Sequence, residues 1–121
     1  MVLSVDKSIR YSAVTNKLGY VVAQKYRPNL HPFMTPEETR RYALLATIRQ
    51  STRSTSDEKL GKTLYSTTRY ERLVRITIPL AEHHLLLLTC DAETKDVDSL
   101  VRNKIIPKLE SYHSQGANYV S

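Results

Sequence analysis

The chain has 121 residues, the size of a single domain, and it carries one cysteine. A domain of this length buries roughly two-thirds of the surface that its unfolded chain exposes, so it needs no metal or disulfide to fold. Cys90 cannot form an internal bridge, and a lone thiol suits a reducing cytoplasm. No stretch approaches the ~20 apolar residues of a membrane span, and residues 1–6 lack the features of a secretory signal. We therefore expect one cytoplasmic domain over residues 1–121, without membrane insertion, with frayed ends at about 1–7 and 114–121.

The balance of charge is basic. Lys and Arg number 18 against 12 Asp and Glu, which gives a net charge of +6. Such an excess suits a polyanionic partner, whether nucleic acid, an acidic protein or a phosphate-bearing ligand. The charges are spread along the chain and form no block of five like charges, which is also typical of an ordinary solvated surface. Net charge alone therefore assigns no partner.

The first regular structure is predicted to be a β-hairpin. Ile9, Tyr11 and Ala13 alternate with polar residues, which is the period of a half-buried strand. Asn16–Gly19 supplies the turn, because Asn and Gly tolerate the positive φ of tight hairpins. Tyr20–Gln24 then returns as the second strand.

A helix is predicted to begin after Thr35. Thr35 can cap it, Pro36 fits its first position, and Glu38 lies three residues beyond the cap. The preceding segment 27–32 contains prolines that favour an extended connection. The helix is expected to fade over Ser51–Ser56, because hydroxyl side chains compete for backbone hydrogen bonds. This segment is the predicted mobile loop.

The same helix carries a stripe of large apolar residues. Tyr42, Leu45 and Ile48 recur at a spacing of three, with Leu44 at the margin and arginines on the flanks. Residues at this spacing share one face of a helix. We interpret the stripe as the face that packs on the core.

Three strands are predicted to follow in close succession. Thr63–Tyr70 is rich in residues that favour strands. Leu73–Leu80 alternates cleanly, with aliphatic residues on one side and Arg75 and Thr77 on the other. Leu85–Leu88 is apolar at every position, and a strand that is apolar on both faces must be covered on both. We therefore place it in the middle of the sheet.

The last predicted helix begins near Asp96, which can cap it. Its apolar face consists of Val97, Leu100, Val101 and Ile105. Pro107 removes a backbone hydrogen bond and should kink or end the helix. The element order is then β-β-α-β-β-β-α, an α/β (α+β) fold in which a five-stranded, mainly antiparallel sheet has helices on its faces.

The hairpin segment Val14–Ala23 is similar to the roadblock pattern of an apolar strand, a polar turn closing on Gly, and a second apolar strand ending in a small residue. With the element order over residues 8–112, the chain resembles the roadblock and longin group of profilin-like domains. Longin domains begin with the hairpin, whereas roadblock domains usually open with a long helix. The chain also resembles small uncharacterised archaeal proteins. The roadblock and longin resemblance implies a homodimer, joined through a sheet edge or a helix, that serves as a scaffold or a regulator of small GTPases without catalytic residues.

The histidines form no metal-binding pattern. His83 and His84 are neighbours in a predicted strand, so they point to opposite faces and cannot readily share a metal ion. Glu82 could join His84, but two ligands make a poor site. His31 and His113 have no ligand spacing around them. We expect no metal.

Other patterns of catalytic chemistry are also missing. Cys90 follows a buried strand without a partner to stabilise its thiolate, so we expect it to serve packing. Three glycines at 19, 61 and 116 cannot form a phosphate-binding loop. No nucleophile elbow or paired carboxylates stand out. The sequence thus predicts a protein that is not an enzyme and has no cofactor.

Arginines form the candidate anion-binding surface. Arg49 and Arg53 lie four residues apart at the end of the first helix, and hence on one face if the helix continues. Arg69, Arg72 and Arg75 lie on or beside the central hairpin, with tyrosines nearby. Guanidinium groups bind phosphate bidentately, and aromatic rings can stack on bases.

Three hypotheses about function follow. The first is a non-catalytic interaction module of roadblock or longin type, a homodimer that holds or regulates a protein partner such as a small GTPase. The second is nucleic-acid binding through the arginines. The third is a sensor for a small ligand held between the sheet and the first helix.

Overall fold

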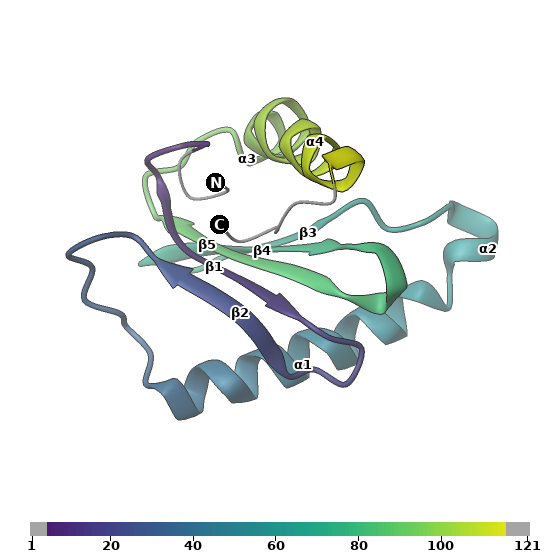
Figure 1. Ribbon diagram of the computed structural model, residues 1–121, viewed down its shortest axis with the longest axis horizontal. Helices are drawn as coiled ribbons and strands as arrows, with labels where there is room; N and C mark the ends of the chain where they lie inside the picture. The colour runs from purple at the N-terminus through teal and green to yellow at the C-terminus, as the bar shows by residue number, and fades with distance from the viewer. Residues whose placement is uncertain (1–4, 116–121) are drawn as a thin grey trace.

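A computed structural model describes residues 5–115 of the chain, with side chains over residues 5–110. The strands are β1 (Ile9–Thr15), β2 (Val21–Tyr26), β3 (Ser66–Arg69), β4 (Leu73–Pro79) and β5 (Leu85–Asp91). The helices are α1 (Pro36–Ser54), α2 (Asp57–Leu60), the short η1 (Ala81–His83), α3 (Val97–Ser99), the π-helical η2 (Leu100–Ile105) and α4 (Ile106–Gln115). The strands form one antiparallel five-stranded sheet, in the order β2-β1-β5-β4-β3 (Figure 1). The predicted α+β fold is confirmed.

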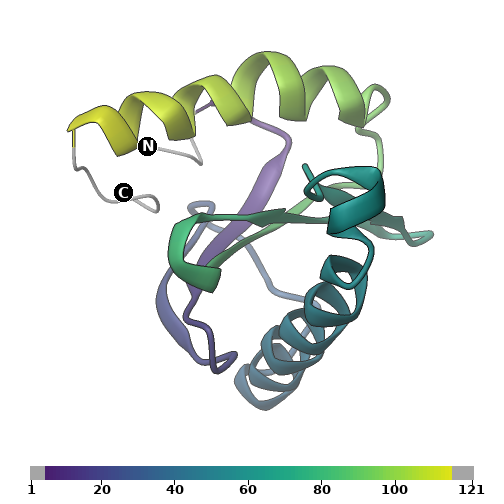
Figure 2. The ribbon, with the colours of Figure 1, turned by 90° about the vertical axis from the view of Figure 1, so that its right-hand side faces the viewer.

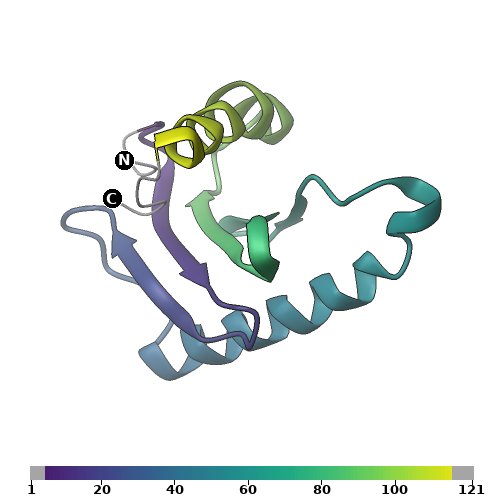
Figure 3. The same cartoon turned by 45° about the vertical axis from the view of Figure 1, so that its right-hand side comes forward.

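The strand order determines where α1 runs. β2 and β3 are consecutive strands, yet they form opposite edges of the sheet. The connection between them must therefore cross one face from edge to edge. α1 makes this crossing, since at about 1.5 Å per residue its 19 residues span about 28 Å. Figures 1 and 3 show α1 beneath the sheet, with the C-terminal helix on the opposite face.

β5 is the central strand, as predicted, and it is buried on both faces. Leu85 and Leu87 point toward α1 and belong to one core cluster. Leu86, Leu88 and Cys90 point the other way and belong to a second cluster beneath the C-terminal helix. All five side chains are at most 2% exposed. The sheet thus separates two cores, one for each helical layer.

The C-terminal helix begins at Asp96, whose carboxylate accepts a hydrogen bond from the Ser99 N–H at 3.0 Å. Its predicted apolar face is buried at Leu100, Val101 and Ile105. Pro107 does not end the helix, which runs on as one continuous body in Figure 2. A π-helical stretch precedes the proline: the Ile106 N–H bonds the Val101 carbonyl, five residues back. This wider turn lies where Pro107 cannot supply an N–H of its own.

α1 begins as predicted but continues further. The Thr35 hydroxyl accepts from the Glu38 N–H at 3.1 Å, and the Glu38 carboxylate accepts from the Thr35 N–H at 2.9 Å. The helix was expected to fade from Ser51, yet it extends to Ser54 and is followed by α2. The hydroxyl of Thr52 donates to a carbonyl of the preceding turn, so this side chain bonds within the helix instead of disrupting it.

An arginine pair joins three strands at one end of the sheet. Asp91, at the end of β5, accepts two bonds from the Arg27 guanidinium at 2.9 and 3.1 Å. It accepts a third from Arg10 of β1 at 3.2 Å. The hydrogen bonds from Arg27 lower the pKa of Asp91 most, and the bond from Arg10 lowers it further. Burial raises this pKa, but the net effect keeps it below its ordinary value. Arg27 directly follows β2, so this cluster connects β1, β2 and β5.

The frayed ends expected at 1–7 and 114–121 lie mostly outside the described residues. Within the described part, Asp6 accepts hydrogen bonds from the Lys104 ammonium and the Ser8 N–H, each at 2.9 Å. The bond from Lys104, helped by Ser8, lowers the pKa of Asp6 to about 2. Asp6 therefore links the start of β1 to the C-terminal helix.

The Asp6 carboxylate should make stability depend on pH in acid. Its pKa falls from 3.8 to about 2 on folding, so its contribution is complete above pH 3.8 and is lost as pH falls toward 2. Asp6→Asn removes this titration, so the free energy of unfolding of the variant should fall less steeply over that window. Urea denaturation at a series of pH values measures it. Glu71→Gln, in the exposed β3–β4 turn, is the control and should follow the wild type; parallel curves for Asp6→Asn would contradict the assignment.

Two glycines provide a matched test of how closely the β1–β2 turn packs on α1. Gly19 and Gly61 have φ values of +88° and +84°. A Cβ at Gly19 would lie 3.0 Å from Leu44 Cδ1, whereas one at Gly61 would meet nothing within 4 Å. Alanine carries a backbone cost at both positions, and at Gly61, with φ 84° and ψ 170°, this cost is about 1–3 kcal/mol because the region is almost confined to glycine. Gly19→Ala adds a clash of about 1–3 kcal/mol. Thermal unfolding should rank wild type first, Gly61→Ala second and Gly19→Ala last; equal melting temperatures for the two variants would show that the turn does not press on α1.

Candidate interaction surface

The outer face of α1 presents large apolar side chains to solvent. Leu44, Leu45 and Ile48 are 46%, 40% and 54% exposed, and we call these three residues the α1 stripe. The prediction that they pack on the core is wrong. Of the predicted core stripe, Tyr42 is the residue that turns toward the sheet, where it packs against the core cluster on the α1 side.

The reason lies in how the layer between α1 and the sheet is filled. Tyr11, Leu85 and Leu87 project from the sheet and pack against Ala43 and Ala46, which are 0% and 3% exposed. Because the sheet supplies the bulk in this close-packed layer, only small residues fit on the helix. The two alanines lie three residues apart and share a face. Their inward position directs the α1 stripe outward.

Arginines surround the α1 stripe. Arg49 and Arg53 make no ion pair within the described part of the chain. The pKa of Glu38, which its hydrogen bonds with Thr35 lower, is lowered further by the charge of Arg41. Arg40 is paired with Glu37, at 2.6 Å, at the start of the helix. From the second turn to its end, α1 contains no acidic residue. Arg41 and Arg49 therefore lie beside the stripe on the outer face, whereas Arg53, seven residues after the buried Ala46, lies toward the sheet.

A stacked arginine extends this cationic surface onto the sheet. The guanidinium of Arg75, on β4, lies 3.7 Å from the ring centroid of Tyr42 and 5.4 Å from that of Tyr70. These distances are those of cation–π contacts. Arg75 likewise makes no ion pair with the residues described. Burial raises the pKa of Tyr42, against the opposing effect of Arg75, so the phenol stays neutral beside the guanidinium.

The five arginines of the predicted anion-binding surface are not brought together. Arg49 and Arg53 lie on α1, and Arg75 lies on the sheet face that α1 covers. Arg69 faces the other way and donates to the carbonyls of Ala92 and Thr94, at 2.9 and 2.6 Å, beyond β5. Arg72 is exposed in the β3–β4 turn. The structure therefore divides the set between the two faces of the sheet.

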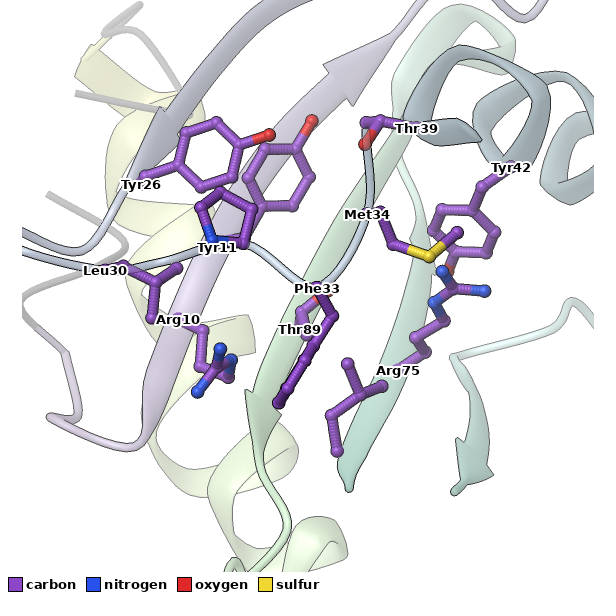
Figure 4. A pocket seen from close by; sticks show the side chains of 12 residues that line it. Arg10, Tyr11, Tyr26, Leu30, Phe33, Met34, Thr39, Tyr42, Arg75 and Thr89 are labelled. Carbon is purple, nitrogen blue, oxygen red and sulfur yellow. The ribbon is translucent and has the colours of Figure 1, made fainter. Parts of the chain in front are cut away.

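A small cavity lies between the β2–α1 connection and the sheet (Figure 4). Phe33 and Met34 of the connection line it, with Arg10, Tyr11 and Arg75 from the strands. Arg10 stacks on the Phe33 ring at 4.7 Å. The volume is about 40 Å³, enough for a few water molecules. Metabolite sites usually measure roughly 300–1,000 Å³, so this cavity does not favour the small-ligand hypothesis.

The remaining reactive residues form no further site. Cys90 is fully buried, as its predicted packing role requires, and burial raises the pKa of its thiol to about 12. His83 lies in η1 and His84 directly after it, not in a strand as expected, because Glu82 and His83 adopt φ near +60° and turn the chain. Among the side chains of residues 5–110, no three His, Cys, Asp or Glu residues could together hold a metal ion. Over the same residues, no helix has the length and apolar character that crossing a bilayer requires.

The fold is similar to several solved structures. The roadblock/LC7 domain from Streptomyces avermitilis matches with a TM-score of 0.67 and 10% identity, covering 89% of this chain and 85% of that one. Myxococcus xanthus MglB matches with a TM-score of 0.69 and 13% identity, over 94% and 86% of the two chains. A structure described as MglB with tetrameric arrangement matches with a TM-score of 0.62 and 19% identity, over 94% and 75%. At sequence identities this low, structural similarity shows that the chain shares the fold of these proteins.

Neither a protein-family model nor a curated protein matches the sequence. The resemblance to roadblock domains is thus confirmed at the level of fold, by structure and not by sequence. The resemblance to archaeal proteins stays a prediction.

The reversed orientation of α1 predicts that two neighbouring substitutions differ in how much they change the free energy of unfolding. Leu45→Gln changes an exposed helical position and should alter the free energy of unfolding by less than about 1 kcal/mol. Ala46→Leu overpacks a filled layer and should destabilise by about 1–3 kcal/mol. Urea unfolding at low protein concentration measures both. A larger loss for Leu45→Gln than for Ala46→Leu would place the leucine in the core.

Proposed function

We propose that the protein is a non-catalytic, cytoplasmic interaction module of roadblock type, which serves as a scaffold or as a regulator of a small GTPase. The α1 stripe carries the proposal: its three large apolar residues are each at least 40% exposed, on a helix whose start is fixed by a capping box. Apolar side chains gathered on an exposed face are typical of protein-binding sites. The similarity to the roadblock/LC7 domain and to MglB supports this function, because it is the role that the roadblock resemblance implies.

We further propose that two copies pair. β3 bonds to β4 on one side and forms an edge of the sheet, so its outer N–H and C=O groups are available to another strand. Edge strands of this kind are a common route to pairing between chains. A protein of the same fold, MglB, is described in a tetrameric arrangement, which is consistent with assembly.

The two other hypotheses have less support. Nucleic-acid binding through five arginines would need them on one surface, whereas Arg69 and Arg75 occupy opposite faces of the sheet. A small-ligand sensor has no metabolite-sized cavity under the β2–α1 connection. The larger hollow of about 1160 Å³, lined by residues of α1, the β4–β5 connection and the C-terminal helix, is the place where such a ligand would fit. The exposed apolar face has no use in either function.

Capture of partners from a native lysate tests the proposal. Leu45→Gln combined with Ile48→Gln removes most of the α1 stripe without changing charge, so the wild type should retain its partner at least about tenfold better than the double variant. The control is Leu60→Gln, at a leucine of α2 that is 82% exposed, and it should behave as the wild type does. Captures are made with and without nuclease, and with either GDP or a non-hydrolysable GTP analogue.

The outcomes separate the parts of the proposal. Partners retained equally by the double variant would contradict docking at the α1 stripe. Retention that ignores the nucleotide would remove the GTPase from the proposal. Loss of every partner on nuclease treatment would favour nucleic-acid binding instead.

A further inference from the structure

We propose that the hollow of about 1160 Å³ at one end of the sheet binds a short amphipathic helix of another protein, one with an apolar face and basic flanks. This hollow lies between α1, the β4–β5 connection and the C-terminal helix, and we call it the end hollow. Figure 3 shows the β4–β5 connection, at η1, with α1 below it and α4 above. None of the three residues of the α1 stripe lines the end hollow, so the inference adds a second surface and does not rest on the first.

Apolar side chains from several elements line the end hollow. Ile78 of β4, Leu85 of β5 and Leu109 of α4 are 3%, 2% and 7% exposed, so they also belong to the core. Leu18 of the β1–β2 turn and Leu64 before β3 are 61% and 55% exposed. An occupant with apolar side chains of its own would remove these two leucines from water, which is the main source of affinity at protein interfaces.

The size of the end hollow favours a helix over a metabolite. Metabolite sites usually measure roughly 300–1,000 Å³, and the end hollow is larger. A helix about 10 Å across fills about 80 Å³ for each ångström of its length, so the end hollow accommodates about 15 Å, or between two and three turns. A segment of this length presents three or four apolar residues from one face.

The wall that α1 contributes is polar and uncharged. Thr47, Gln50, Ser51 and Ser54 line the end hollow at spacings of three and four, so they share one face of the helix. The hydroxyls of Thr47 and Ser54 donate to carbonyls of α1, which leaves their oxygens to accept from an occupant. The Gln50 side-chain oxygen is buried without a hydrogen-bond partner among the described residues, and turning its amide toward the hollow would let it accept as well. This wall therefore calls for donors.

Carboxylates from three other elements add further acceptors. Asp57 of α2, Glu82 of η1 and Glu110 of α4 line the end hollow, and none makes an ion pair within the described part of the chain. Lys17 and Lys62 also line it, but both are exposed, and long lysine side chains turn readily into solvent. The lining thus has an excess of negative charge in a chain whose net charge is +6. Lysine or arginine on the flanks of an occupant would supply both the donors and the charge, whereas nucleic acid would be repelled.

The backbone of the β4–β5 connection sets the direction of one of these carboxylates. Glu82 and His83 have φ values of 59° and 61°, which residues other than glycine rarely adopt. Such conformations persist where the surrounding structure holds them, and they are frequent at binding sites. Both residues line the end hollow.

A synthetic peptide tests the inference. The probe is a capped peptide of about 14 residues, built from Leu, Ala and Lys, with leucines at positions i, i+3, i+4 and i+7. Fluorescence anisotropy at physiological salt should show that the wild type binds it at least about tenfold more tightly than a peptide of the same composition whose leucine spacing is broken. Replacing every Lys of the probe by Glu should weaken binding by about threefold or more, although the chain as a whole is cationic.

Two matched pairs of variants locate the binding. Leu18→Gln with Leu64→Gln changes two exposed leucines of the end hollow and should weaken binding by about tenfold, whereas Leu60→Gln, at an 82% exposed leucine outside it, should bind as the wild type does. Glu110→Lys should weaken binding of the basic peptide by about fivefold. Glu93→Lys makes the same change of net charge at an exposed position outside the end hollow and should have no effect.

Equal affinity for the peptide with broken spacing, or unchanged binding by Leu18→Gln with Leu64→Gln, would overturn the inference. Tighter binding of the acidic peptide would overturn the basic character of the occupant. Laurate that binds the wild type but not this double variant, while the peptide binds neither, would assign the end hollow to a small amphiphile instead.

The inference and the proposed function fail separately. Leu45→Gln with Ile48→Gln should bind the peptide as the wild type does, because neither residue lines the end hollow. Loss of the peptide in this variant alone would place it on the α1 stripe and overturn the inference. The proposed function fails instead if the same variant captures the same proteins from a lysate as the wild type.

Discussion

Strand β5 carries large apolar side chains on both faces, and burying both requires a helical layer on each side of the sheet. The two helical layers contribute side chains of different size to the cores that they cover. The C-terminal helix contributes Leu100, Val101, Ile105 and Leu109 to its core. α1 contributes Ala43 and Ala46, and the sheet itself fills the rest of that layer. The large apolar residues of α1 are left on the outside as a consequence.

This unequal arrangement exposes large apolar side chains on a helix whose position is fixed. α1 must cross the sheet because it connects strands at opposite edges, so its position is set by topology. Its start is capped at Thr35, and its flanks are held by Gly19 and by Arg75 on Tyr42. A partner that docks on a preorganised helix has little backbone to order, which lowers the entropic cost of association.

The sequence allowed much of the fold to be predicted but not which face of α1 is buried. The cap at Thr35 and the doubly apolar Leu85–Leu88 are local signals, and both were interpreted correctly. Along α1, Ala43 and Ala46 are three residues apart, as are Leu45 and Ile48, so periodicity cannot say which pair faces the sheet. The face of the sheet on which each strand arginine lies depends on the strand register. Arg69 pairs with Val74, and shifting the hairpin by one residue would turn Arg69 to the face of Arg75. Such details are set by packing between distant segments.

The distribution of charge completes this picture. The carboxylates of Asp6, Asp91 and Asp98 are bound to cations of this chain, and they connect strands and helices. On α1, Arg49 and Arg53 make no ion pair within the described residues, and Arg49 lies beside an apolar stripe that provides contact area. Apolar burial supplies most of the free energy of association, whereas charge steers the encounter and excludes like-charged partners. The same sequence thus uses these acidic residues to connect parts of the fold, and leaves apolar and basic side chains exposed together on α1.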